Sequence, residues 1–192
     1  MLAARDLSKR FGEKRVFAHV DLDLAAGRLL LVTGPNGSGK TTLLRVLAGI
    51  TAPSGGELRL PARSLVGYVG HEPLVYRELT PLENLTLFGK LYRVRERAER
   101  IGMLLERFGL WDVRHERVAT FSRGMQQRLA ICRALLHEPD LYVLDEPYNA
   151  LDAAGAELLD RTLDELAPHA LVVATHDPGR VERLATDRLE LV

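Results

Sequence analysis

The chain has 192 residues, of which 46% are apolar, and this suffices for one large domain with a buried core. Basic and acidic residues number 26 each, so the chain lacks the overall positive field with which proteins bind nucleic acid chiefly through phosphates. No apolar run approaches the ~20 residues of a membrane-spanning helix, and the N-terminus lacks the form of a signal peptide. The single cysteine, Cys132, cannot form an internal disulfide and is expected to be a small core residue in a reducing cytosol.

Two strands are expected near the N-terminus, over residues 2–7 and 15–24, the second because its apolar residues alternate with polar ones. The connection between them is polar except for Phe11. A lone aromatic residue here is either part of the core or, if a nucleotide binds nearby, a platform for its adenine base.

The next segment is a glycine-rich loop between a predicted strand, residues 29–32, and a predicted helix, residues 42–48. It matches the phosphate-loop pattern G-x-x-x-x-G-K-[ST] in the run Gly34, Pro35, Asn36, Gly37, Ser38, Gly39, Lys40, Thr41 and Thr42. The N–H groups of such a loop and of the helix N-terminus attract phosphate. Lys40 then reaches the β- and γ-phosphates, and the Thr41 hydroxyl binds Mg²⁺. A simple turn would need neither residue, so the loop predicts a nucleoside triphosphate site.

Gly49 is expected to end this helix in a left-handed conformation, and short strands are predicted over residues 57–60 and 66–70. The second strand runs into His71, followed by Glu72 and Pro73. Polar groups that follow a strand can face a ligand, although a surface position is the simpler explanation for His71.

A helical unit is predicted over residues 82–110, where apolar residues recur at helical spacing. Its charged stretch, residues 93–100, is either a solvated helix face or a partner-binding face. Ser122 opens a further helix, with its pattern over residues 129–137. Ser122 makes a good N-cap, and the free N–H groups behind it would also suit an anion.

Two adjacent carboxylates, Asp145 and Glu146, end the predicted buried strand at residues 141–145. Adjacent acids at the end of a buried strand repel each other and are poorly solvated, so a bound cation best explains them. In a phosphate-loop protein Asp145 should hold Mg²⁺, and Glu146 can orient or deprotonate water.

A helix over residues 153–166 and a buried strand over residues 171–175 follow, and His176 comes directly after that strand. In open α/β sheets ligands collect at the carboxyl ends of strands. We therefore expect the phosphate loop, the two acids and His176 to meet, although they are far apart in the sequence.

Together these segments resemble the nucleotide-binding subunit of ABC transporters, over nearly the whole chain from Leu7 to Val192. The order of the motifs is the specific part of the resemblance. It implies a role at each matching position: Phe11 as the adenine-stacking aromatic, Gly34 to Thr41 as the Walker A loop, Leu141 to Asp145 as the Walker B strand, Glu146 as the catalytic glutamate, Asn149 to Asp152 as the D-loop, and His176 as the switch histidine.

Two positions depart from the family pattern. The run Ser122-Arg123-Gly124-Met125 resembles the ABC signature, but Arg123 and Met125 replace its first glycine and its glutamine. Ser122 and Gly124 remain, and by resemblance they contact the γ-phosphate of a partner subunit's nucleotide. His71 stands where the family usually has a glutamine. Imidazole is shorter and can be cationic, which disfavours direct contact with Mg²⁺.

The implied fold is an α/β P-loop NTPase. A mainly parallel sheet is flanked by helices, with an antiparallel N-terminal β portion and an inserted helical subdomain. The whole chain, residues 1–192, is then a single ABC ATPase domain. Its RecA-like core comprises residues 1–72 and 138–192, and the helical subdomain about 73–137.

The implied activity is ATP hydrolysis that drives a transmembrane permease from the cytoplasmic face of the membrane. Lys40, Mg²⁺ and His176 would stabilise charge while Glu146 acts on water. Each subunit offers a Walker face and a signature face, which implies a head-to-tail dimer of this chain with itself or with a second ABC ATPase. Nucleic acid is not an expected partner. The rival interpretations are a soluble ABC ATPase that acts on ribosomes or DNA, and a scaffold that binds ATP without turnover.

The resemblance also bears on the direction of transport. The chain ends soon after a predicted strand at residues 188–192, without the C-terminal regulatory domain of many importers, and its signature resembles small export-type ATPases. Within that group, the runs from Gly70 to Pro73, Leu79 to Leu85 and Leu144 to Asp152 resemble the haem-exporter ATPases of cytochrome c maturation. Multidrug-type exporters share most of these features and remain the alternative.

Overall fold

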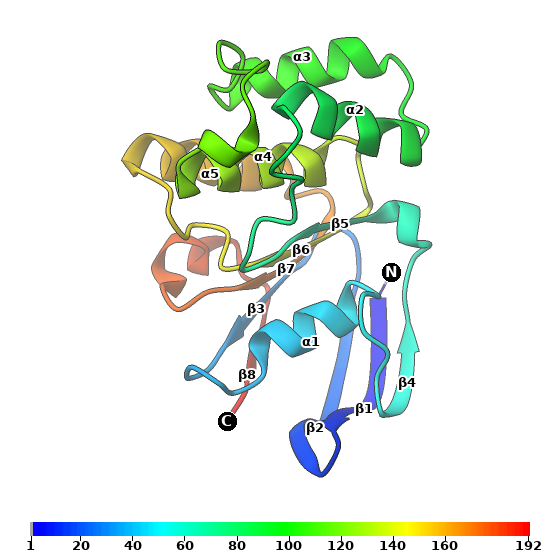
Figure 1. The fold of residues 1–192 in the computed structure, drawn as a ribbon. Coiled ribbons are helices and arrows are strands. Elements are labelled where there is room, and N and C mark those ends of the chain that lie inside the picture. Colours follow the sequence, from blue (N-terminus) through cyan, green and yellow to red (C-terminus); the bar gives the residue numbers. More distant parts are fainter. Residues whose placement is uncertain (1) are drawn as a thin grey trace.

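The computed structural model describes residues 2–192, which form two sheets and the helices around them (Figure 1). The strands are β1 (Leu2–Phe11), β2 (Lys14–Leu24), β3 (Leu29–Thr33), β4 (Gly55–Arg59), β5 (Val66–Val69), β6 (Leu141–Asp145), β7 (Ala170–Ala174) and β8 (Asp187–Glu190). The α-helices are α1 (Lys40–Leu47), α2 (Pro81–Leu91), α3 (Arg97–Arg107), α4 (Arg123–Leu135) and α5 (Ala153–Glu165). Short 3₁₀ helices lie at Arg63–Leu65, Val118–Thr120, Pro178–Arg180 and Glu182–Leu184.

The antiparallel sheet has the strand order β2-β1-β4 and comes mostly from the N-terminal part of the chain. β1 is longer than the expected strand over residues 2–7 and continues to Phe11. It continues because Phe11 pairs with Lys14 across a tight turn, in which Gly12 has a φ of 56°. Glycine accepts this left-handed conformation without steric cost. The hairpin therefore holds Phe11 at the end of a strand and not in a loose connection.

The second sheet is entirely parallel, with the strand order β5-β6-β7-β3-β8. Its central strands are continuous apolar runs because both of their faces are buried. Successive side chains of a strand point to opposite faces. In β3, Leu29 and Leu31 accordingly join one core cluster, while Leu30 and Val32 join the other.

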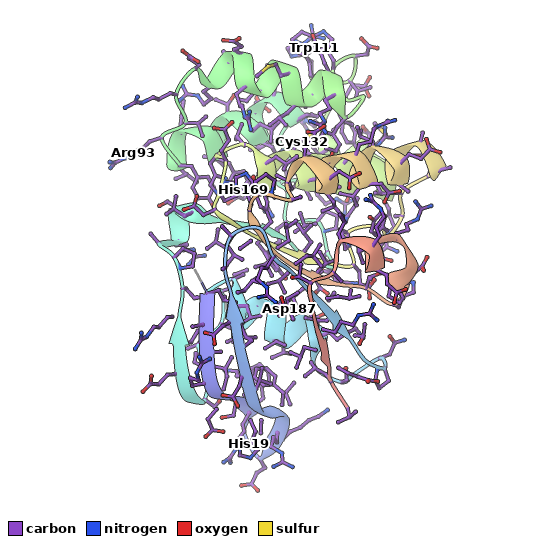
Figure 2. The ribbon with its side chains drawn as sticks, turned by 180° about the vertical axis from the view of Figure 1, so that it is seen from behind. His19, Arg93, Trp111, Cys132, His169 and Asp187 are labelled. Atoms are coloured by element: carbon purple, nitrogen blue, oxygen red, sulfur yellow. The ribbon has the colours of Figure 1, made fainter. Side chains whose placement is uncertain are left out.

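The parallel sheet lies between two apolar layers (Figure 1). On one face, α1 and the antiparallel sheet complete the cluster that contains Leu30 and Val32. On the other face, α4 and α5 complete the second cluster, which contains Leu29 and Leu31. The helices α2 and α3 lie beyond α4 and share that second cluster. Cys132 belongs to this helical layer and is fully buried, as the sequence predicted (Figure 2). This mixed α/β architecture with separate parallel and antiparallel sheets confirms the predicted fold class.

The helical unit differs from the single pattern expected over residues 82–110. It consists of α2 and α3, separated by a turn in which Arg93 and Glu96 have left-handed backbone conformations. Neither glycine nor proline occurs in this turn, so no residue there signals the end of a helix. Helix α4 begins at Arg123, before the pattern expected from residue 129. Ser122 is its N-cap, as predicted, and its side chain accepts a hydrogen bond from the Met125 N–H at 3.2 Å.

Helix α1 ends as predicted. Gly49 has a φ of 68°, its N–H donates to the Val46 carbonyl at 3.0 Å, and the Ile50 N–H donates to the Arg45 carbonyl at 2.9 Å. This pair of bonds is the Schellman motif, which satisfies carbonyls that the helix itself leaves unpaired. Among the helices of residues 2–192, none has both the length and the apolar character required to cross a membrane.

Candidate active site

A cavity of about 700 Å³ lies where the loops after β3, β5, β6 and β7 meet, at the carboxyl ends of these parallel strands. The ligand site was predicted from the sequence at this same edge of the sheet. Of the residues predicted for the site, Gly34, Pro35 and Ser38 belong to the glycine-rich loop without lining the cavity. The lining residues are Phe11, Lys14, Arg15, Val16, Asn36, Gly37, Gly39, Lys40, Thr41, Thr42, His71, Asp145, Glu146, Asn149 and His176.

The glycine-rich loop connects β3 to the first turn of α1. Its glycines are required where they stand: Gly37 and Gly39 have φ values of 83° and 100°, and a Cβ on Gly34 would lie 2.2 Å from the Leu191 carbonyl oxygen. No side chain caps the N-terminus of α1, so its free N–H groups can bind phosphate oxygens. The loop therefore has the form of an anion cradle.

Lys40 begins α1 and is itself buried, with 8% of its surface exposed. Its ammonium group donates hydrogen bonds to the carbonyl of Gly34 at 2.7 Å and to that of Pro35 at 3.1 Å. A buried cation is stable only when it is paired or hydrogen-bonded. These two carbonyls hold the ammonium over the loop, close to where phosphate oxygens would bind.

Asp145 is 1% exposed, and neither of its carboxylate oxygens has a hydrogen-bond partner. Burial raises the pKa of this carboxyl above its usual range. The nearby Thr41 hydroxyl and His71 oppose the rise, although Thr41 makes no hydrogen bond of good geometry to the carboxylate. An unpaired buried carboxylate beside a hydroxyl fits a divalent cation with oxygen ligands. Within residues 2–192 the structure shows no group of three acidic, histidine or cysteine side chains that could hold a metal ion.

Glu146 and His176 contact each other directly. One carboxylate oxygen of Glu146, Oε2, lies 2.8 Å from His176 Nδ1 and accepts a second hydrogen bond from the His176 main-chain N–H at 3.2 Å. Since an ionised carboxylate can only accept, the Nδ1 atom bonded to it carries a proton. Glu146 is 9% exposed and lines the cavity, so its other oxygen, Oε1, is free for a ligand there.

Phe11 lies at the cavity wall and is 57% exposed, so its interpretation as a core residue is wrong. The Lys9 ammonium lies 4.8 Å from the centre of its ring. Three residues that the sequence did not predict for the site line the same wall: Lys14, Arg15 and Val16. They lie there because the turn after Phe11 folds β2 back along β1. The two cations carried no signal by themselves, since only the hairpin places them near the glycine-rich loop.

His71 lines the cavity from the loop after β5. Its Nδ1 lies 3.5 Å from the side-chain nitrogen of Asn149, at the outer limit of a hydrogen bond. The structure thus places His71 beside Asn149 at the cavity. His71 is exposed, as expected of a surface residue, and it lines the cavity in which a ligand would bind.

Ser122 and Gly124 lie outside the cavity, at the start of α4. Ser122 caps this helix, and a Cβ on Gly124 would lie 2.6 Å from the Ala150 carbonyl oxygen. The signature segment therefore packs against the loop that follows Glu146. Any nucleotide bound in the cavity of this chain would lie away from this chain's own Ser122.

Residues 17–149 match the model of the protein family described as ABC transporter. The chain belongs to the ABC transporter family. It is an ATP-binding domain of that family, one of its ATPase cassettes. It is similar to a solved structure described as "Dimeric structure of a post-hydrolysis state of the ATP-binding cassette MJ0796 bound to ADP and Pi". That match has a TM-score of 0.89 at 28% identity, over 100% of this chain and 94% of the other.

Curated relatives differ in how much of their length this chain spans. The chain is 36% identical to the ABC transporter ATP-binding protein YdbJ of Bacillus subtilis, over the whole chain but only 66% of YdbJ. It is 39% identical to the cytochrome c biogenesis ATP-binding export protein CcmA of Rhizobium meliloti, over 92% of this chain and 91% of CcmA. The chain thus spans about two thirds of YdbJ and nearly all of CcmA.

Proposed function

We propose that this chain binds ATP with Mg²⁺ and hydrolyses it as the ATPase subunit of an ABC transporter. The observation that supports this most directly is the convergence, in one cavity, of Lys40, Thr41, Asp145, Glu146 and His176 from three separate segments of the chain. A scaffold that only binds nucleotide would not need the paired Glu146 and His176.

Each part of the ATP molecule has a candidate contact in the cavity. The N–H groups of the glycine-rich loop and Lys40 bind the phosphates, and the exposed ring of Phe11 stacks on adenine. Thr41 and Asp145 would hold Mg²⁺, which neutralises the phosphate charge that develops during phosphoryl transfer. The unpaired oxygens of Asp145 fit this role because a cation would satisfy both of them.

Glu146 acts on the attacking water, and His176 orients the Glu146 carboxylate. His176 holds Oε2 of Glu146 with two hydrogen bonds, which leaves Oε1 to accept a proton from water. Nδ1 of His176 donates its proton in the hydrogen bond to Glu146. The other ring nitrogen, Nε2, is therefore available to contact the γ-phosphate. We infer no metal contact for His71, and we propose instead that it contacts a phosphate oxygen or the water, since it lines the cavity.

Glu146→Gln tests the proposed chemistry. The amide keeps the shape of the side chain and removes the group that accepts the proton, so turnover should fall by roughly 10²-fold or more. Binding of MgATP, measured by equilibrium titration, should be retained. Turnover close to that of the wild type in a purified sample would refute the role of Glu146. An inactive wild type that binds ATP would instead support the scaffold interpretation.

We further propose that two ABC ATPase domains assemble head to tail, with each signature segment completing the other's site. Ser122 and Gly124 lie outside this chain's own cavity, so they can reach a nucleotide only if it is bound by a partner. The similarity to the MJ0796 cassette, whose structure is described as dimeric, supports the assembly of two such domains. In this assembly residues 73–137 act as the helical subdomain that faces a transmembrane permease at the cytoplasmic face of the membrane, and residues 1–72 and 138–192 act as the core.

Among possible substrates we propose haem, exported for cytochrome c maturation. The support is the match to CcmA of Rhizobium meliloti over nearly the full length of both proteins. An import protein, SsuB 3 of Rhodococcus jostii, is 38% identical over 66% of its length, so identity alone does not choose the direction of transport. Deleting the gene in its native host should reduce covalently bound c-type haem. Unchanged holocytochrome with impaired export of drugs or lipids would favour a multidrug-type exporter.

A further inference from the structure

Glu146 has a backbone conformation that the surrounding structure must impose. Its φ is 50°, a left-handed value that non-glycine residues rarely adopt and that side chains larger than asparagine tolerate poorly. Four hydrogen bonds hold its main chain and carboxylate. Its N–H donates to the Ala174 carbonyl at 2.8 Å, and its carbonyl accepts from the Asn149 N–H at 3.0 Å. Its Oε2 accepts from the His176 N–H at 3.2 Å and from His176 Nδ1 at 2.8 Å. None of these bonds involves the carbonyl of the next residue, Pro147.

That partner comes from α4. The side chain of Gln127 is buried at 2% exposure, and its Nε2 donates a hydrogen bond to the Pro147 carbonyl at 3.1 Å. One helical turn earlier, the absence of a side chain at Gly124 lets α4 approach the Ala150 carbonyl closely. Helix α4 therefore contacts the loop after Glu146 at two points, of which Gln127 provides the only directional bond in the contacts described for residues 2–192.

We propose that Gln127 is a positioning residue for Glu146. The Gln127 amide fixes the carbonyl of Pro147, the residue after Glu146. This bond keeps the left-handed backbone of Glu146 from relaxing and so keeps the Glu146 carboxylate against His176. Ser122 caps the N-terminus of the same helix. The signature segment and the Glu146 carboxylate of one chain are therefore held in one rigid arrangement. The effect on turnover rests on the ATPase function proposed above, whereas the effect on the position of Glu146 does not.

The test compares Gln127→Met with a matched control, Gln126→Met. Both substitutions exchange an amide for a thioether of similar length at neighbouring positions of α4. Gln126 donates to the Phe121 carbonyl at 3.0 Å, before the helix, and makes no bond to the loop after Glu146. Gln127→Asn is the second variant. Its side chain is one methylene shorter, so its amide cannot reach the Pro147 carbonyl, and it provides the test if Gln127→Met fails to fold.

The first readout is independent of catalysis. The His176 N–H is bonded to the Glu146 carboxylate, so its hydrogen exchange in the chain without nucleotide reports the position of that carboxylate. We expect Gln127→Met to speed this exchange by roughly tenfold or more while Gln126→Met leaves it unchanged. The second readout is kinetic: kcat should fall by up to roughly 10²-fold with KM changed less than about twofold, because misplacing a reacting group affects chemistry more than binding.

The outcomes separate the inference from the proposed function. His176 exchange that stays at the wild-type rate in both Gln127 variants overturns the positioning role, whatever the turnover. Equal acceleration in the Gln126 control overturns it as well, since that would indicate general loosening of α4. A wild-type protein without ATPase activity would refute the proposed function, and the exchange comparison would then decide the role of Gln127 alone.

Discussion

Asp145→Asn should have opposite effects on the free chain and on its complex with nucleotide. Both oxygens of this carboxylate are buried, and neither has a hydrogen-bond partner among residues 2–192. An unsatisfied buried polar group costs about 1–3 kcal/mol, and an ionised one costs more. Replacing the carboxylate by a neutral amide should therefore stabilise the chain without nucleotide by about 1 kcal/mol, which raises Tm by roughly 2–4 °C in a domain of this size.

With nucleotide the direction reverses, because the carboxylate is then expected to bind Mg²⁺. A ligand at 100 times its Kd stabilises the folded state by about 2.7 kcal/mol, or roughly 5–11 °C for this domain. We expect a non-hydrolysable ATP analogue with Mg²⁺ to raise the Tm of the wild type by more than the analogue with EDTA does. In Asp145→Asn the two conditions should give nearly the same Tm.

The pH dependence follows from the raised pKa of Asp145. Below about pH 3.9, the pKa of an unfolded aspartate, the group is protonated in both states and Asp145→Asn gains little. As the pH rises from 3.9 through the native pKa, the folded state holds a proton that the unfolded state has lost, so the wild type loses stability. The Tm advantage of Asp145→Asn should grow across this window and then level off.

Asp140→Asn is the matched control for these measurements. Asp140 precedes the same strand at its other end, carries the same charge and is exposed. It should show neither the gain in Tm nor the loss of the Mg²⁺ effect. The reasoning is refuted if Asp145→Asn is less stable than the wild type near pH 7 without nucleotide, or if it keeps the full Mg²⁺-dependent shift.

Three further predictions concern the rim of the site and the signature segment. Phe11→Ala should leave Tm almost unchanged, since the ring is exposed, but weaken ATP binding roughly 2- to 10-fold while binding of inorganic triphosphate stays constant. Ser122→Arg should block ATP-dependent dimerisation in sedimentation of a Glu146→Gln background, whereas Ser122→Asn keeps the cap and should dimerise; an undiminished dimer in both would exclude a role across the interface. Gly124→Ala should lower Tm by several degrees because the new Cβ would lie 2.6 Å from the Ala150 carbonyl oxygen. Gly102→Ala should not, because its new Cβ would meet only the Trp111 ring, at an ordinary contact distance of 3.7 Å.

Much of the site was predictable because its chemistry is local in the sequence. The run from Gly34 to Thr41 combines glycine freedom, a lysine and a hydroxyl within one turn, so spacing alone identifies a phosphate cradle. The adjacent acids Asp145 and Glu146 are informative for the same reason, since two carboxylates after a buried strand need a cation. Continuous apolar runs also identified β3, β6 and β7 as buried parallel strands, because both faces of such strands are covered.

Other features depend on contacts between segments that the chain brings together only on folding. The exposure of Phe11 follows from the hairpin that carries it, and the break between α2 and α3 follows from two left-handed residues that no local signal marks. Similarly, nothing near Glu146 in the sequence shows that its backbone is strained or that Gln127, 19 positions earlier, holds the next peptide. Periodicity and motifs describe what a segment can do alone. The strained backbone that positions the Glu146 carboxylate is imposed by packing between segments, and the energies of that packing depend on the whole fold.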